Sequence, residues 1–259
     1  NNSAVGYNAL RQNTTGTGNN SFGLQTLDAN TSGDYNTAFG HVALSANVSS
    51  AGNTAFGSQV LYNATGANNT AVGNTAGYAI TSGSNNLLLG ADAGRTGSPG
   101  GNYTSENNAI VLGDENIAEA QIQVDWTVAS DQRDKTDFTA LDLGLDFVKA
   151  LAPVTYKWDK RSKYGDKTAD DYDLLDQTPD GTHKEDWLDV GFKAQEVEAL
   201  EQAAGYNKSN KTNLMSSHTG DGKQMGLQYS KFVPILVKAI QEQNALIEAL
   251  TARVATLEG

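Results

Sequence analysis

A five-residue pattern of alternating polar and apolar positions, typified by Asn-Thr-Ala-Phe-Gly at 36–40, recurs along the first 113 residues. A fixed period is typical of stacked units, none of which can bury its apolar face alone. The unit is too short for a pair of helices and suits one or two short strands, so the pattern predicts a repetitive β-solenoid or β-roll over residues 1–113. Successive motif glycines are spaced by 17, 17, 17, 16, 17 and 23 residues, at Gly6, Gly23, Gly40, Gly57, Gly73, Gly90 and Gly113.

Each predicted coil contains few large apolar residues, which leaves little to bury in a single chain. Three chains packed around a common axis would bury the Val, Phe and Leu positions together, so we expect a trimeric shaft. The repeat resembles the β-roll heads of trimeric bacterial adhesins and the shafts of phage tail fibres. Two interpretations stay open for its surface, a spacer without a binding role and a receptor-binding face.

The periodicity changes after the repeat. In the connector 114–129, Ile122, Val124 and Trp126 alternate with polar residues, which predicts a strand. Beyond it, apolar spacing predicts helices over 137–150 and 192–203, with a strand between them over 154–158. These elements predict an α+β domain over 130–259.

Heptad spacing predicts a coiled-coil helix over about 231–258. In peptides, β-branched residues at position a with Leu at d favour dimers, but a polar d residue can set the oligomeric state instead. We expect a trimer because the shaft calls for three chains, and the alternative is a helix packed on its own domain. Position a holds Val233, Ile240, Ile247 and Val254, and position d holds Leu236, Gln243, Leu250 and Leu257.

Charge divides the chain near its middle. Residues 1–129 carry 2 basic and 8 acidic side chains, and residues 130–259 carry 16 and 22, so each half has a net charge of −6. An acidic chain without a basic cluster is a poor candidate for binding nucleic acid or an anionic membrane. The sequence has no cysteine and no apolar run long enough for a membrane-spanning helix. We expect neither a cofactor nor a metal, although the aspartates of 159–189 leave a calcium loop as the alternative to a solvated insertion. Because the chain starts inside a repeat, we expect it to be the C-terminal part of a longer protein.

The candidate chemistry lies at the boundary between the two halves, in the run Ser130-Asp-Gln-Arg-Asp-Lys135. A serine hydroxyl becomes a nucleophile when a neighbouring base removes its proton. Lysine can be that base if burial lowers its pKa. Asp131 and Arg133 are candidates to hold the pair in place. The alternative is an ordinary polar turn in which Ser130 caps a helix.

The same run, Ser-Asp-x-Arg-x-Lys, resembles the signature of the S74 peptidase family, the intramolecular chaperone domains at the C-termini of phage tail spikes and fibres. Three further stretches resemble the family in the same order, so the resemblance covers essentially all of 130–259. Phe138 departs from it, since an aliphatic residue is commoner there. The three stretches are Leu151–Trp158, Asp189–Glu198 and Tyr229–Gln243.

The resemblance implies that the domain trimerises, templates folding of the upstream fibre, and then releases itself by autoproteolysis. It implies that Ser130 is the nucleophile and Lys135 the base. We expect a single cut at the bond between Ala129 and Ser130, and the bond after Ser130 is the alternative. The expected location is a virion tail fibre made in the host cytoplasm, with a homotrimer and a host surface receptor as partners. Two alternatives are a trimeric adhesin or fibre tip with a permanent, non-cleaving cap, and a cellular protein that releases a regulatory fragment.

Overall fold

The computed structural model covers residues 1–259 and describes all of them except 168 and 170. The chain forms two compact units. The first, the solenoid unit, comprises Asn1–Glu119, Asp159–Glu185 and His218–Gln224. The second, the helical unit, comprises Ala120–Trp158, Asp186–Ser217 and Met225–Gly259.

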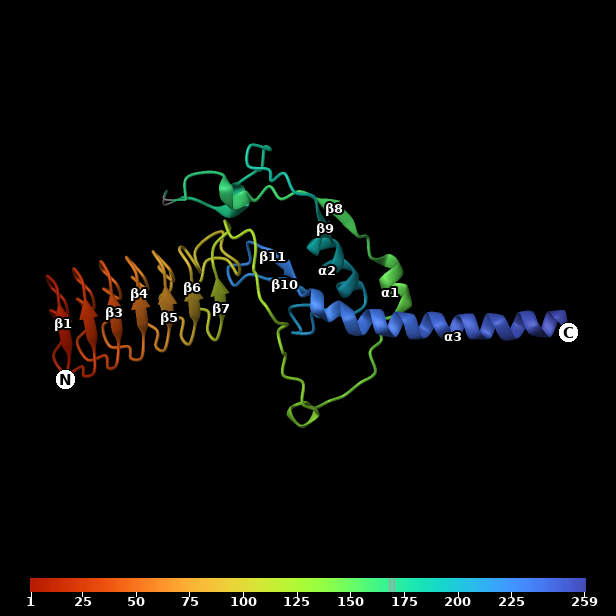
Figure 1. Ribbon diagram of the computed structural model, residues 1–259, viewed down its shortest axis with the longest axis horizontal. Coiled ribbons are helices and arrows are strands. Elements are labelled where there is room, and N and C mark those ends of the chain that lie inside the picture. The colour runs from red at the N-terminus through yellow and green to blue at the C-terminus, as the bar shows by residue number, and fades with distance from the viewer. Residues whose placement is uncertain (168, 170) are drawn as a thin grey trace. The chain divides into compact units, whose positions relative to one another are not determined.

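The predicted solenoid is confirmed, with one short strand in each coil. Seven strands form a single parallel sheet in which every strand pairs with the next along the chain (Figure 1). The register follows the sequence repeat, since Ala38 lies opposite Ala55 and Ala55 opposite Ala71. The strands are β1 (Ser3–Val5), β2 (Asn20–Phe22), β3 (Thr37–Phe39), β4 (Thr54–Phe56), β5 (Thr70–Val72), β6 (Leu87–Leu89) and β7 (Ile110–Leu112).

The solenoid core is narrow because the inward side chains are small. The middle residue of each strand from Ser21 onward is buried, and it is alanine in three successive coils. A leucine from the following turn fills the remaining space at Leu27, Leu44 and Leu61, each fully buried. Successive side chains of a strand point to opposite faces, so the third residue of each strand points outward.

A column of buried asparagines holds successive coils together. The side-chain Oδ1 of Asn36 accepts a hydrogen bond of 3.0 Å from the Asn53 backbone N–H, and Asn53 accepts one of 2.9 Å from Asn69. The motif asparagine is therefore an interior residue of the solenoid. The motif glycine is needed in the next turn, because Gly40 has a φ of +131° and an added Cβ would overlap the Gly57 carbonyl.

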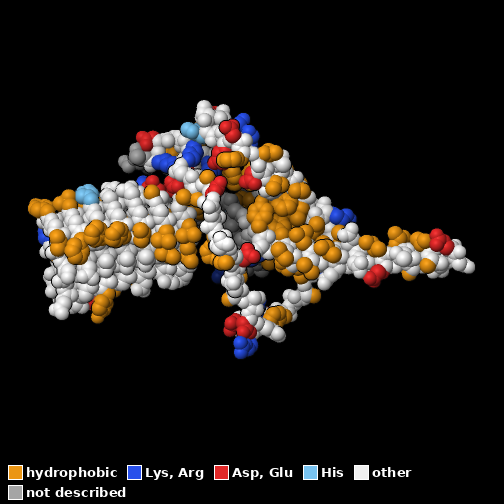
Figure 2. Space-filling model, in the orientation of Figure 1, with side chains coloured by type: hydrophobic (Ala, Val, Ile, Leu, Met, Phe, Trp, Pro, Cys, Tyr) orange, Lys and Arg blue, Asp and Glu red, His pale blue; other side chains and the backbone are white. Residues whose placement is uncertain are grey.

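The outward residues form an apolar ridge along the solenoid, visible as the orange stripe in Figure 2. Phe39 and Phe56 stack with their ring centroids 4.7 Å apart, and the members are 37–59% exposed. Contiguous exposed apolar surface of this kind is uncommon on soluble monomers. The ridge consists of Val5, Phe22, Phe39, Phe56, Val72, Leu89 and Leu112.

Two segments from the second half of the sequence belong to the solenoid unit. One is 159–185, which contains the 3-10 turns η2 (Arg161–Lys163) and η3 (Leu174–Asp176), and the other is 218–224. Two contacts tie the segments together. Arg161 donates a hydrogen bond of 2.7 Å to the Lys223 carbonyl, and Lys223 pairs with Asp173 at 2.9 Å.

The helical unit is built around three helices and two short strand pairs (Figure 1). Its core joins Phe147, Val197, Met215, Phe232 and Ile235. The helices are α1 (Leu145–Ala150), α2 (Ala194–Ala203) and α3 (Phe232–Glu258). The strands are β8 (Val154–Tyr156), β9 (Asp189–Gly191), β10 (Ser216–His218) and β11 (Met225–Leu227), and the 3-10 turns are η1 (Gln132–Asp134) and η4 (Tyr229–Lys231).

Two predicted elements differ from the structure. The helix expected over 137–150 is confined to α1, because Gly144 precedes it with a non-helical backbone (φ −140°, ψ −134°) and residues 135–143 form no regular element. The strand expected around Ile122–Trp126 is not formed in the single chain. A strand needs a partner for its backbone N–H and C=O groups, and local alternation cannot supply one.

One buried carboxylate joins α2 to residues 214–216, where β10 begins. Glu201 is fully buried, and its carboxylate accepts backbone hydrogen bonds from Leu214 at 2.7 Å, from Met215 at 2.5 Å and from Ser216 at 3.0 Å. Burial alone raises the pKa of Glu201, but the hydrogen bonds from residues 214–216 outweigh it and hold the pKa below the ordinary glutamate value.

We predict that Glu201→Gln destabilises the helical unit by about 1.5–3 kcal/mol at neutral pH, the usual worth of hydrogen bonds to a buried charge. Because the folded pKa is lowered, this stability is fully present above the ordinary value of 4.5 and is lost as the pH falls through the folded value. All three tryptophans lie in the helical unit, so denaturant unfolding followed by tryptophan fluorescence measures it.

The exposed Glu258→Gln is the matched control and should change nothing. The prediction would be contradicted if the difference in unfolding free energy between the wild type and Glu201→Gln stayed constant as the pH falls well below 4.5.

Candidate cleavage site at Ser130

The candidate site is a tight turn just inside the helical unit. Asp131 caps η1, since its side chain accepts a hydrogen bond of 2.9 Å from the backbone N–H of Arg133. The turn closes when the Lys135 N–H donates to the Gln132 carbonyl at 3.2 Å. The interpretation of Ser130 as a helix cap is therefore wrong, because Asp131 takes that role and the Ser130 hydroxyl stays available.

The turn brings the two ends of the run together. Lys135 Nζ donates a hydrogen bond of 2.6 Å to Ser130 Oγ. This separation is within the reach that a base needs to remove the hydroxyl proton. The spacing of five residues did not fix this geometry by itself, since η1 has to fold between the two residues.

Asp131 and Arg133 form an ion pair on the same turn. Arg133 Nη2 lies 2.6 Å from Asp131 Oδ2, and Arg133 Nε donates to Asp131 Oδ1 at 3.1 Å. The side-chain hydrogen bond from Arg133 holds the pKa of Asp131 below its ordinary value. A carboxylate that stays ionised keeps accepting the Arg133 N–H, so the pair stabilises the turn that joins Ser130 to Lys135.

All of these residues are exposed in the single chain. Ala129, Ser130 and Lys135 lie in a stretch whose side chains face solvent throughout. A lysine acts as a base when its ammonium group is desolvated. The single chain supplies the hydrogen-bond geometry of a Ser–Lys pair but not the dry surroundings.

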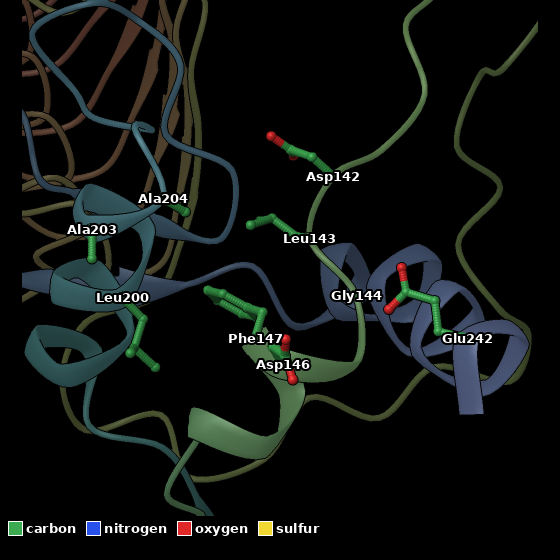
Figure 3. A pocket seen from close by; sticks show the side chains of 9 residues that line it. All are labelled: Asp142, Leu143, Gly144, Asp146, Phe147, Leu200, Ala203, Ala204 and Glu242. Carbon is green, nitrogen blue, oxygen red and sulfur yellow. The ribbon is translucent and has the colours of Figure 1, made fainter. Parts of the chain in front are cut away.

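A hollow in the helical unit is lined by residues other than those of this turn. It has a volume of about 380 Å³, and Figure 3 shows Phe147 of α1 pointing toward Leu200 of α2. On its rim, the Glu242 carboxylate accepts a hydrogen bond of 2.7 Å from the Leu145 N–H at the start of α1. Its lining contains no candidate nucleophile, so we assign it to the packing of α1 against α2 and α3.

The calcium loop considered for 159–189 has no support among the residues that the structure describes, where no three carboxylate or imidazole groups gather as a metal site. Asp173 caps η3 and pairs with Lys223, and Asp180 accepts from Thr182. Asp170, one of the aspartates behind that alternative, lies outside the described residues.

Sequence reasoning missed the role of segment 159–185, which it treated as a solvated insertion. The segment packs in the solenoid unit, where Lys167 pairs with Glu115. Its basic run at Lys160, Arg161, Lys163 and Lys167 is complementary to the acidic Asp114-Glu115 pair, and this charge pattern could have indicated the contact.

Comparison with known proteins finds a family match within the second half of the chain. Residues 130–206 match the family model Peptidase S74, described as the chaperone of endosialidase. The match begins at Ser130 itself. No curated protein and no solved structure matches the chain. Across the part of the chain that the structure describes, no helix has the length and apolarity to span a membrane.

Proposed function

We propose that residues 130–206, which match the S74 chaperone family, belong to a domain that assembles three chains into a fibre end and then cuts itself from the fibre. An intramolecular chaperone role follows from the family. The observation that carries the proposed cleavage is the 2.6 Å hydrogen bond between Lys135 Nζ and Ser130 Oγ, at the first residue of the family match.

The proposed reaction is one hydrolysis of the Ala129–Ser130 bond. Neutral Lys135 takes the proton from Ser130 Oγ, and the oxygen attacks the Ala129 carbonyl carbon. The C–N bond breaks, the Ser130 nitrogen receives the proton from Lys135, and an ester joins Ala129 to Ser130 Oγ. Water, giving its proton to Lys135, then attacks the ester, and Ser130 Oγ leaves with that proton. The products are fragments 1–129 and 130–259. Asp131 and Arg133 are proposed as positioning residues.

The outer part of α3 supports assembly through a coiled coil. Its buried residues Phe232, Ile235 and Ala239 pack within the helical unit and occupy heptad positions g and c. The predicted a and d residues lie on another face, and Ile240 and Leu250 remain 64% and 62% exposed. The helix therefore packs on its own domain while leaving its predicted seam for other chains.

Two more apolar surfaces support three chains in the shaft. The ridge on the solenoid is exposed along its whole length, and a second copy of the chain would bury it. The connector carries Ile122, Val124, Trp126 and Val128 at alternate positions, each 52–78% exposed. Paired with its copies, this segment would form the strand that its alternation predicts.

Assembly would also switch on the cleavage. The Ser–Lys pair is exposed in one chain, and Lys135 needs a desolvated environment to act as a base. We propose that neighbouring chains cover the turn in the trimer, so that cutting follows folding and assembly. In this scheme the fibre belongs to a virion tail made in the host cytoplasm, and its tip meets a receptor on the host surface.

The test is the intact mass of the purified chain over time. We expect the parent mass to disappear and two fragments to accumulate, ending at Ala129 and beginning at Ser130, with one added water in their summed mass. A chain that stays intact as a stable trimer would contradict the proposal and favour the fibre tip with a permanent cap.

A further inference from the structure

The solenoid unit is built from both sides of the proposed cut. Residues 1–119 precede the Ala129–Ser130 bond, whereas 159–185 and 218–224 follow it. We propose that these two later segments form a cap that keeps fragment 130–259 bound to fragment 1–129 after the chain is cut. The proposal rests on the proposed cleavage for its setting, but the cap itself is a non-covalent contact that can be tested without it.

The last coil of the solenoid differs from the others where the cap meets it. The spacing between Gly90 and Gly113 is 23 residues, against 16 or 17 elsewhere, and the additional residues lie around 94–103. In this longer turn, the Asn102 N–H donates a hydrogen bond of 3.0 Å to Asp221. The last coil of a solenoid has no successor to cover it and needs a cap, and the longer turn meets the cap directly.

Two glycines of the long turn allow the cap to approach its backbone. Gly101 has a φ of +82°, and an added Cβ would lie 2.8 Å from the Asp221 carboxylate and 2.9 Å from Thr219. Gly97 has a φ of +96°, and its Cβ would lie 2.7 Å from Ser162 of η2. Both parts of the cap therefore pack on the same turn at a distance that only glycine permits.

Charge complementarity adds to this close packing. The Glu115 side chain is only 7% exposed and pairs with Lys167. Lys160 donates a hydrogen bond of 3.0 Å to the Glu115 carbonyl, and Lys163 bonds to the Asn116 side chain. Removing one partner of a desolvated ion pair leaves the other buried without compensation and mainly speeds dissociation.

None of these contacts involves the bond that is cut. Hydrolysis between Ala129 and Ser130 removes a covalent link through the exposed connector but leaves the cap on the last coil. The ligand of the cap is thus this chain's own 1–129 fragment. Cleavage makes release possible, and the cap decides how fast it occurs.

The test separates retention from self-cleavage. A recognition sequence for a site-specific protease is inserted in the connector after Gln121 of the full-length Ser130→Ala chain, which is then cut by the added protease and passed through a gel-filtration column. We expect the two fragments to co-elute at low salt and to separate faster at about 1 M salt, where charges are screened beyond about 3 Å.

Two variants address the two kinds of contact. Gly101→Ala places a Cβ against Asp221 and Thr219, and its matched control is Gly222→Ala, which also has positive φ (+71°) but nothing within 4 Å of the added Cβ. Lys167→Glu reverses the charge beside Glu115, and its control is Lys193→Glu, which breaks an exposed ion pair with Glu196 in the helical unit. We expect the two fragments of each test variant to separate at least about thirtyfold faster than those of the parent chain. The fragments of each control should separate at the parent rate.

If the fragments of the parent chain separate immediately, the proposal that the cap holds them together is refuted. Co-elution that persists in both Gly101→Ala and Lys167→Glu would also overturn it, because another surface would then hold the fragments together. Either result leaves self-cleavage untouched, since the added protease makes the cut. Conversely, a wild-type chain that never cuts itself would refute the proposed function while the engineered cut still tests the cap.

Discussion

Ser130→Ala should leave the chain uncut, with a cleavage rate at least about a thousandfold below that of the wild type. The alanine removes the oxygen that Lys135 contacts at 2.6 Å, and the reaction then has no nucleophile. The chain should still assemble, because Ser130 lies in an exposed turn and contributes to neither core. Intact mass measured over time, with the mass in solution measured alongside it, checks both statements.

Two further variants separate chemistry from simple disturbance of the turn. Lys135→Arg keeps the positive charge but cannot act as a base, since arginine stays protonated, so it should be as inactive as the alanine variant. Thr136→Ala removes an exposed hydroxyl from the next residue and should cut at the wild-type rate. Cleavage of Ser130→Ala at the same bond would refute the mechanism, and cleavage of Lys135→Arg at the wild-type rate would refute the role of Lys135.

Placing aspartate at two seam positions of α3, as Ile240→Asp with Ile247→Asp, should convert the proposed trimer to a monomer and abolish the proposed cleavage. Both residues are predicted a positions and are 64% and 54% exposed in one chain, so the substitutions cost the isolated fold little. In an assembled coiled coil each charge would be buried in an apolar seam, which costs several kcal/mol per ion. Sedimentation in the Ser130→Ala background measures assembly, and intact mass in the wild-type background measures cutting.

The matched control carries aspartate at Ala245 and Ala252, both at position f on the outer face of the same helix. It has the same added charge and a larger cost in helix propensity, because alanine is the better helix former, and it should assemble and cut normally. A seam variant that stays trimeric would show that α3 is not the assembly element. A monomeric seam variant that still cuts would show that the Ser–Lys pair needs no neighbouring chain.

The two predictions also bear on each other. If the cut depends on assembly, Ser130→Ala should be an uncut trimer, whereas the seam variant should be an uncut monomer. The exposure of Ser130 and Lys135 in the single chain is the reason to expect this difference. A chaperone that cut before assembly would lose its covalent hold on a fibre that has not yet folded.

The sequence alone determined the elements that depend on neighbouring residues. The constant spacing of the motif glycines specified a solenoid, because each coil repeats the same local contacts with the next. Heptad spacing specified α3, which begins within a residue of its predicted start. The Ser130–Lys135 run was recognisable because its six consecutive residues resemble the S74 signature, although their spacing alone did not fix the geometry of the pair.

Contacts between distant segments were decided only by the tertiary structure. The composition of 159–185 indicated a solvated insertion, yet this segment packs in the solenoid unit against residues more than 40 positions earlier, such as Glu115. The sequence pattern placed Glu201 simply on a helix, but the fold buries it against the amides of 214–216. The predicted helix over 137–150 shortened to α1, where Glu242 caps its first turn from almost a hundred residues away. Sequence periodicity reflects the local structure of each coil or helix. Burial and charge pairing depend instead on which distant segments the fold brings together.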